Sequence, residues 1–559
     1  MPHPDARKSR SEVKTAPARS WSRSRSGQRP PSLPRVKSSQ RLIRTISIEG
    51  RSHDGRAEEG RAEDGDDGLL RLAFGSEKQQ YIEVPYVKAT LDASLPEEYL
   101  RQDVVNMTWN LQVPKWYRPG TRVAPEEVKL VMITGTMTNA IFKVEHPRLP
   151  SLLLRVYGPN VESIIDRDYE LQTLARLSRQ NIGPSLYGCF MNGRFEQFLE
   201  NATTLTKKDI RDWKTSQRIA RRMKEFHCGV PLLDWEKTHY TVLARIDKWL
   251  KKMGDSSWIQ KKGNLQSTLF VQEWSQFLAV FERYRAWLKS VGELDQSLVF
   301  CHNDAQYGNL LFTAPVVATD TSSVGTSTST PVSGSLFPSE SNISLDDIIR
   351  PSIHDQSQDS KLVVIDFEYA GPNPAAYDLA NHLSEWMADY HCAESYKTFE
   401  HKFPKKEEIL NFIYSYTSHL SASKQDPIDD KVRELYNSIL RWRPCVSLHW
   451  AIWGLMQSGE LDEPKDLAVA VEGAGPGGEK YIITVDDCES INSIDSCLTD
   501  CSAVEEPTAK GADIHSFDYV SYTIEKMCLF YGDLLQLGIL SKDDLPPGVQ
   551  PKFLDSTFL

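Results

Sequence analysis

Two short apolar runs that each end in an acidic turn constrain the fold of this chain more than any other feature. The first is LVFCHNDAQYGNLLF at residues 298–312, and the second is KLVVIDFEYAG at residues 361–371. Apolar runs bounded by turn residues are typical of buried strands, and these two deliver Asp304 and Asp366 to their turns. We therefore expect two strand-and-turn units whose acids serve one site.

The spacing inside the first turn indicates phosphoryl transfer. Asn309 follows Asp304 by five positions, as in the catalytic loop of protein kinases, and Asp366 stands where their second acidic turn has its aspartate. In such sites a carboxylate accepts the proton of the attacking hydroxyl, and amide and carboxylate oxygens hold Mg²⁺ ions on the nucleotide phosphates. We predict that Asp304 is the catalytic base and that Asn309 and Asp366 bind metal. For residues 302–304 alone, the alternative is a turn that caps a helix.

The residues before this turn favour a small antiparallel sheet that covers a nucleotide. Strand-like runs occupy residues 128–133, 140–145 and 151–158, around the turn TGTMTN. Gly135 and Asn139 are candidates for contact with the nucleotide, although an ordinary hairpin explains a lone glycine equally well.

A charged pair is predicted beside this turn. Arg155 ends an apolar run and offers a fixed positive charge for the phosphates, and Glu170 lies on a helix predicted at residues 166–178. We expect Glu170 to orient Arg155 as a Glu orients the nucleotide-binding Lys of kinases. The alternative is a surface salt bridge.

The rest of the chain is predominantly helical. Strand and turn patterns return at residues 181–199, and helical patterns follow near 215–228, 240–253, 268–290, 375–391, 405–420, 431–457 and 516–538. A β-rich small lobe followed by a helical large lobe is the implied architecture, an α+β fold.

Acidic and aromatic side chains recur at helical spacing in the large lobe. Asp378, Asn381, Glu385 and Asp389 share one face of the helix predicted at 375–391, and Leu379, Leu383, Trp386 and Tyr390 share the next. Trp450 and Trp453 stand three apart, and Phe517, Tyr519 and Tyr522 open the last helix. Such stripes are usually core, but with Glu385 they could also surround a small cation, because aromatic faces attract quaternary ammonium groups.

Several of these segments together resemble the eukaryotic choline/ethanolamine kinases, which have a protein-kinase-like, two-lobed fold. They are VFCHNDAQYGNLLF, VIDFEYAGPNPAAYDLANHLSEW, IGPSLYG and RFEQFL. The resemblance implies the roles given above for Asp304, Asn309 and Asp366, and ATP contacts from Arg155 and Gln197, to which we add Leu199. It also implies an amino-alcohol pocket, made of Tyr369, Glu385, Tyr390, Trp450, Trp453, Phe517 and Tyr522. The chain departs from the family at Gly135-Thr136, where the family tends to have paired glycines.

The resemblance implies an ATP- and Mg²⁺-dependent kinase that converts choline to phosphocholine for phosphatidylcholine synthesis. Trp386 resembles the choline-preferring members, since ethanolamine kinases tend to have Phe there; ethanolamine or dual specificity is the alternative. A kinase-fold scaffold would require loss of Asp304, Asn309 or Asp366. An aminoglycoside phosphotransferase would favour acidic loops over aromatic rings.

The termini and inserts complete the expected organisation. Residues 1–80 are predicted to be a disordered basic tail, 81–200 the nucleotide-binding lobe, and 201–559 the catalytic lobe with disordered inserts at 313–360 and 460–515. The first 50 residues carry 12 Lys and Arg against three acids, so the net charge of −11 leaves −20 on the remainder, which argues against nucleic-acid binding. The absence of a long apolar run and of a secretory signal predicts a cytoplasmic protein without membrane insertion; a transit peptide is the competing reading of the tail.

Three further expectations concern partners and modification. Arg41-Leu-Ile-Arg-Thr-Ile-Ser47 places hydroxyls beside arginines and predicts that a protein kinase acts on the tail. The family resemblance implies a homodimer. Cys488, Cys497 and Cys501 lack the spacing of a metal site.

Overall fold

The computed structural model describes most of the chain outside its N-terminal arm and two long inserts. The described residues are 43–47, 68–74, 80–135, 139–157, 167–180, 182–261, 263–313, 336–338, 343–421, 427–461, 471–474, 480–483 and 517–559. All of them fall in one compact unit, Leu42–Leu559. Residues 1–42, 48–67 and 75–79 of the tail expected at 1–80 lie outside the described residues, as do the three cysteines of the acidic insert.

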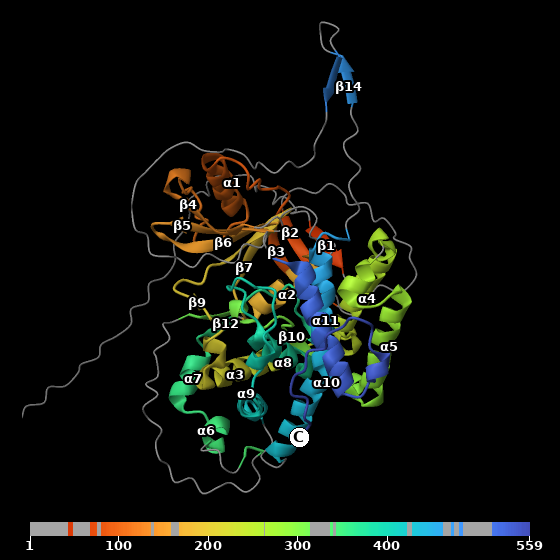
Figure 1. The fold of residues 1–559 in the computed structure, drawn as a ribbon. Helices are drawn as coiled ribbons and strands as arrows, with labels where there is room; N and C mark the ends of the chain where they lie inside the picture. The colour runs from red at the N-terminus through yellow and green to blue at the C-terminus, as the bar shows by residue number, and fades with distance from the viewer. Residues whose placement is uncertain are drawn as a thin grey trace, which may run out of the picture. The chain divides into compact units, whose positions relative to one another are not determined.

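An eight-stranded sheet forms the N-terminal lobe (Figure 1). Its strands are β1 (Ile43–Ser47), β2 (Gly68–Phe74), β3 (Gln80–Val87), β4 (Lys129–Gly135), β5 (Asn139–His146), β6 (Leu149–Tyr157), β7 (Leu186–Phe190) and β8 (Gly193–Gln197), in the order β1-β2-β3-β7-β8-β6-β5-β4. The pairs β1–β2 and β3–β7 are parallel and the others antiparallel. The sheet is therefore larger than the small antiparallel sheet we expected, and two of its strands, β1 and β2, fall within the expected tail.

The sheet packs against two helices. On β6, Leu152, Leu154 and Val156 are buried in alternation, as in a strand with one covered face. They share a hydrophobic cluster with residues of α1 (Glu97–Asn110), a helix that the sequence patterns did not predict. A second helix, α2 (Arg167–Arg179), contacts β3 and β7 and matches the helix predicted at 166–178.

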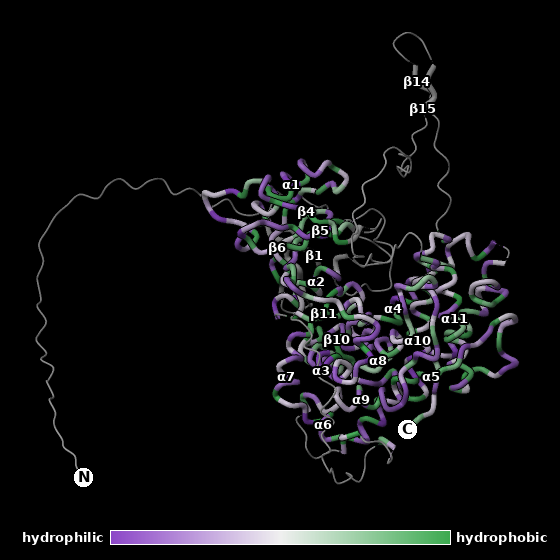
Figure 2. Tube along the Cα trace, turned by 60° about the vertical axis from the view of Figure 1, so that its left-hand side comes forward, coloured by the Kyte–Doolittle hydropathy of each residue, from purple (hydrophilic) through white to green (hydrophobic). Residues whose placement is uncertain are grey.

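The C-terminal lobe is built mainly of helices. They are α3 (Trp213–Gly229), α4 (Thr241–Asp255), α5 (Trp274–Ser290), α8 (Ala375–Ser384), α9 (Lys406–Ser418), α10 (Ile428–Gln457) and α11 (Tyr519–Gln536). Figures 1 and 2 show α10 and α11 side by side, and the tube in Figure 2 alternates between hydrophilic and hydrophobic along these helices, as amphipathic helices do. The expected α+β architecture, a β-rich lobe followed by a mainly helical lobe, is confirmed.

One predicted helix is shorter than expected. Helix α8 ends at Ser384, and Glu385–Met387 form a 3₁₀ turn. Glu385 and Asp389 therefore do not continue the helical face of Asp378 and Asn381. All four side chains are buried, so this set is not a solvated surface.

The inserts are partly ordered. In the insert expected at 313–360, the structure describes α6 (Leu345–Ile349) and α7 (Ile353–Asp359), each preceded by a serine that caps it. Ile348 is buried, and Arg221 donates two hydrogen bonds to Asp359 at 2.6 and 2.9 Å. This part thus differs from a disordered loop, because the Ser/Thr-rich composition gives way to capped helices. In the second insert, β14 (Val471–Ala474) pairs with β15 (Lys480–Ile483).

Among the described residues, no helix is both long and apolar enough to cross a membrane.

Candidate active site

Two short strand pairs hold the acidic turns together. β10 (Val299–Cys301) pairs with β13 (Gly371–Asn373), and β11 (Leu310–Phe312) pairs with β12 (Leu362–Val364). The backbone N–H of Ile365 donates to the carbonyl of Asn309 at 3.0 Å, and His302 Nε2 lies 2.9 Å from the Ile365 carbonyl. The two turns that the sequence singled out thus lie side by side.

Asp304 and Asn309 face each other across the first turn. The amide nitrogen of Asn309 donates to the Asp304 carbonyl at 3.0 Å and to Asp304 Oδ2 at 2.9 Å. Burial raises the pKa of Asp304 well above its ordinary value, and the negative charges of Glu385, Asp366 and Glu368 raise it further. A carboxylate with a raised pKa holds a proton more strongly than an ordinary one, which suits a general base.

Asp366 lies where a charged ligand can reach it. Its φ of 67° is in the left-handed region, and its Oδ1 atom is buried without a hydrogen-bond partner. The nearest described cation is Arg155, whose Nη1 lies 3.9 Å from that oxygen. A buried carboxylate oxygen with no donor indicates that a partner binds there.

A buried carboxylate supports the catalytic turn from behind. Asp378 on α8 is fully buried and accepts hydrogen bonds from the backbone N–H groups of His302 and Asn303, both at 2.8 Å. Asn303 has a φ of 65°, and its side chain donates to the Tyr369 carbonyl at 2.9 Å. Sequence reasoning missed this role; the only signal was the position of Asp378 on a polar helix face that begins just after the second turn.

Asp378 also belongs to the one group of three or more potential metal donors found among the described residues. Its Oδ2 lies 2.9 Å from His227 Nε2, and Cys301 completes the group, with ligand atoms within 4.8 Å of one another. These donors already have partners: His227 Nδ1 contacts the Tyr416 hydroxyl at 2.8 Å, and Cys301 donates to the Asn373 carbonyl at 3.4 Å. The group therefore serves to anchor the catalytic turn.

Among the residues predicted to bind the nucleotide, one contact differs from expectation. Glu170 forms an ion pair with Arg194 of β8 at 2.8 Å, and Arg194 also pairs with Glu196 at 2.5 Å. Arg155 stands opposite Arg194 on the neighbouring strand and reaches Asp366. Glu170 thus acts on Arg155 as one charge of a buried cluster, and a described ion pair joins Glu170 to Arg194.

The other predicted nucleotide residues lie on strands of the same sheet or just after one of them. Gln197 ends β8 opposite Leu152, and its side-chain oxygen accepts from the Ser185 N–H at 3.3 Å. Leu199 follows β8 and is half-buried. Gly135 ends β4, and Asn139 begins β5; the side-chain environment of these two positions lies outside what the structure describes.

The predicted pocket rings form a continuous aromatic cluster. The ring of Trp450 lies 5.3 Å from Tyr369 and 5.5 Å from Trp453, and Trp453 lies 6.0 Å from Tyr522. Phe517 continues the cluster, at 5.5 Å from Tyr522. Three of these four pairs are edge to face, with the edge of one ring packed against the face of its neighbour.

Glu385 and Tyr390 supply the polar part of this cluster. The Tyr390 hydroxyl donates to Glu385 Oε2 at 2.8 Å, and Glu385 is 2% exposed. Glu385 is close enough to Tyr522 for its charge to raise the pKa of the Tyr522 hydroxyl, after burial, which acts more strongly. A buried carboxylate beside several rings is an arrangement that attracts a small organic cation.

Tyr369 joins the acidic turns to the aromatic cluster. Its carbonyl accepts from the Asn303 side chain of the catalytic turn at 2.9 Å, and its hydroxyl accepts from Trp453 Nε1 at 2.7 Å. Tyr369 therefore contacts both the turn that carries Asp304, through Asn303, and the aromatic cluster, through Trp453.

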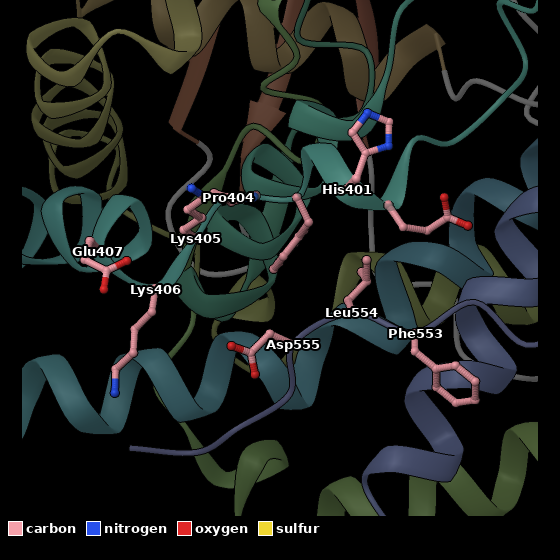
Figure 3. Close-up of a pocket in the computed structure, with 10 residues that line it drawn as sticks. His401, Pro404, Lys405, Lys406, Glu407, Phe553, Leu554 and Asp555 are labelled. Atoms are coloured by element: carbon pink, nitrogen blue, oxygen red, sulfur yellow. The ribbon is translucent and has the colours of Figure 1, made fainter.

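A surface pocket of about 510 Å³ lies elsewhere on the lobe (Figure 3). It is lined by residues 400, 401, 403–407 and 553–555, and in Figure 3 basic and acidic side chains such as Lys406 and Asp555 stand around it. None of the predicted site residues lines it, so it is not the site of the chemistry.

Comparison with known proteins agrees with this geometry. The model of the family "Choline/ethanolamine kinase" matches residues 130–531, and that of "Choline kinase N terminus" matches residues 76–124. A choline kinase of Saccharomyces cerevisiae is 49% identical and aligns over 96% of each chain. An ethanolamine kinase of the same yeast is 36% identical over 91% of this chain and 90% of its own.

Among solved structures, a choline kinase from Cryptosporidium parvum covers 78% of this chain and 97% of its own, with 17% identity and a TM-score of 0.49. The family assignment rests on the sequence matches, which extend over most of the chain and include both acidic turns. The chain therefore belongs to the choline/ethanolamine kinase family.

Proposed function

We propose that the protein transfers the γ-phosphoryl group of ATP to the hydroxyl of choline, giving phosphocholine and ADP. The observation that carries this proposal is the link through Tyr369, held at its carbonyl by the catalytic turn and at its hydroxyl by Trp453. A quaternary ammonium group bound by the rings and Glu385 would leave the short hydroxyl arm of choline directed toward Asp304.

Asp304 is the base in this mechanism. Its raised pKa gives it a stronger affinity for the proton of the choline hydroxyl than an ordinary aspartate has. Asn309 fixes the carboxylate through its amide nitrogen, and Asp378 fixes the backbone of the turn. The base is thus held in place before the substrate arrives, which lowers the cost of orientation.

The residues present fit Mg²⁺. Both hydrogen bonds of the Asn309 side chain come from its nitrogen, which leaves its oxygen as a ligand, and the buried Asp366 Oδ1 lacks a hydrogen-bond partner. Oxygen atoms of amides and carboxylates are the ligands that Mg²⁺ prefers. When bound, the ion would neutralise charge on the transferred phosphoryl group. Arg155, which approaches Asp366, and Gln197 would hold the phosphates and the rest of ATP.

Ethanolamine kinase activity is the second candidate, because both an ethanolamine kinase and a choline kinase are among the yeast relatives. Identity with the choline kinase is higher, which favours choline. Trp386, the sequence position that also favours choline, is buried beneath the Arg211 guanidinium at 4.9 Å and has no described ring contact within the aromatic cluster. Its influence on specificity would be indirect.

The test is turnover of MgATP by the purified full-length protein with choline, with ethanolamine and with no acceptor. We expect kcat/KM for choline to exceed that for ethanolamine by about tenfold or more, equivalent to ~1.4 kcal/mol of discrimination. A preference for ethanolamine would keep the mechanism and reject the choline assignment. No phosphorylated product with either would reject the kinase activity and favour a scaffold.

Replacing Trp453 with alanine is expected to raise the KM for choline about fivefold to thirtyfold, with a smaller effect on kcat. The ring would bind the ammonium group, which is remote from the transferred phosphoryl group. Trp453→Phe keeps an aromatic face but removes the hydrogen bond to Tyr369. The KM of this variant for choline should therefore lie between those of the wild type and of Trp453→Ala. Steady-state kinetics at saturating ATP would measure both; an unchanged KM in Trp453→Ala would remove this ring from the choline site.

Some expectations stay predictions. A homodimer, a cytoplasmic location and a protein kinase acting on the tail are compatible with the family but are not tested by the described contacts. Ser47 lies at the end of β1, where only the backbone is described.

A further inference from the structure

Lys526 is a buried lysine beside the aromatic cluster. It lies on α11 one helical turn after Tyr522, is 3% exposed, and its Nζ stands 5.1 Å from the centre of the Tyr522 ring. Lysine is almost never fully buried unless its charge is balanced. The protein therefore already holds one cation against a ring that the choline site is proposed to use.

The charges around Lys526 come from three segments. Glu525, its neighbour on α11, is engaged by Lys552 at 2.6 Å and by the backbone N–H of Thr398 at 2.9 Å. Lys552, from the C-terminal segment, also pairs with Glu400 at 2.9 Å. Glu525 is thus held by another lysine.

Glu385, from the turn after α8, is the remaining acid. Its described hydrogen bond comes from the neutral hydroxyl of Tyr390. Burial lowers the pKa of Lys526, and the charge of Glu385 opposes this more strongly than that of Glu525, while Lys552 adds to the lowering. Glu385 is therefore the acid whose charge acts most strongly on Lys526. Glu385 contacts Tyr390 and Lys526 contacts Tyr522 in the same cluster, and no described ion pair joins the two charged groups.

We infer that Lys526 balances Glu385 in the empty pocket and competes with the ammonium group of the substrate for it, so that this lysine sets the affinity for cationic acceptors. The inference rests on the proposed function, because it takes the aromatic cluster as the acceptor site. When a cationic acceptor binds, two positive groups face one buried carboxylate, and their repulsion is strong in a medium of low dielectric constant. A quaternary ammonium group cannot lose its charge, so choline experiences this repulsion in full.

An uncharged acceptor of the same shape would not be repelled by Lys526. 3,3-Dimethylbutan-1-ol replaces the ammonium nitrogen of choline with carbon and keeps the hydroxyl arm, so it reports packing without charge. Comparing the two ligands separates an electrostatic role of Lys526 from a purely structural one.

The experiment measures the Kd of choline and of 3,3-dimethylbutan-1-ol by titration calorimetry on the full-length protein, and the KM of choline. Lys526→Met removes the charge and keeps an unbranched side chain of similar length. We expect the Kd and KM for choline to fall about threefold to tenfold, and the Kd of the neutral alcohol to stay within about twofold. An unchanged or higher Kd for choline, or an equal shift for both ligands, would overturn the inference.

Two further variants of Lys526 guard against a fold defect, and a third variant elsewhere controls for net charge. Lys526→Gln should act in the same direction as Lys526→Met, and Lys526→Arg, which keeps the charge, should return the choline KM toward the wild-type value. Lys289→Met, at an exposed position in the last turn of α5, makes the same change in net charge and should leave both ligands unaffected. If Lys289→Met also lowered the Kd for choline, the effect would come from net charge alone, and the inference would be overturned.

Glu385→Gln distinguishes this inference from the proposed function. If Glu385→Gln raises the KM for choline while Lys526→Met does not lower it, the proposed acceptor site is supported and the inferred role of Lys526 is rejected. If Glu385→Gln leaves the KM unchanged, the cluster is not the acceptor site, and both fall.

Discussion

Replacing Asp304 with asparagine is expected to lower kcat for choline phosphorylation about 10²- to 10⁴-fold while ATP still binds. The amide cannot accept the hydroxyl proton, but its oxygen can still accept the hydrogen bond from Asn309 that holds the turn. Arg155 pairs with Asp366, not Asp304, so the residues proposed to hold the phosphates should keep their contacts. Steady-state kinetics and calorimetric titration with MgATP would measure the two effects.

A matched control separates the base from a general loss of negative charge. Asp295→Asn removes the same charge from an exposed position shortly before β10 and should keep the wild-type kcat. A kcat for Asp304→Asn within tenfold of wild type would contradict the assignment of the base. Loss of ATP binding would instead indicate a role for Asp304 in metal binding or folding.

Replacing Asp378 with asparagine is expected to lower the free energy of unfolding by about 2–4 kcal/mol and to reduce kcat as well. The carboxylate accepts from His302 N–H, Asn303 N–H and His227, and an amide group would turn a donor toward one of these donors. The catalytic turn would then lose part of its support, although Asp378 does not touch the reacting atoms. Urea unfolding and kcat, measured on the same preparation, would test both parts.

The direction in which the loss of stability in Asp378→Asn changes with pH also follows from the structure. Burial opposes ionisation of Asp378, but the hydrogen bond and charge of His227, with those of His302, outweigh it and lower the pKa of Asp378. Its contribution is therefore complete above the pKa of the unfolded state and is lost as pH falls through the lowered value. The stability gap between wild type and variant should narrow at acidic pH. Asp247→Asn, which breaks an exposed pair with Arg285, should cost less than about 1 kcal/mol; an equal loss at both positions would contradict the supporting role.

Much of the fold could be predicted because its signals are local. Period-2 and helical patterns within single segments gave β4 to β6 and most long helices. The acidic turns were found because chemistry requires their residue types at short fixed spacing, as with Asp304 and Asn309. The structure also brings the predicted rings, from Tyr369 to Tyr522, into one cluster.

The features that were missed depend on contacts between distant segments. Glu170 pairs with Arg194, which the sheet places beside Arg155, and no spacing within the chain reveals that strand order. Asp378 resembles any polar helix residue until the turn of residue 302 is packed against it. Helix α8 ends at Ser384 although the helical spacing of polar residues continues, and the 3₁₀ turn that follows places Glu385 in a hydrogen bond with Tyr390.

The central claim is that one site joins a cation-binding cluster to a base for phosphoryl transfer. The most direct test follows the label from [γ-³²P]ATP in the presence of choline and Mg²⁺, with ADP measured in the same samples. The account predicts that labelled phosphocholine and ADP form in equal amounts and that ADP formation without an acceptor is much slower. ADP formation without labelled phosphocholine would show that water, not choline, occupies the acceptor position, and would contradict the account.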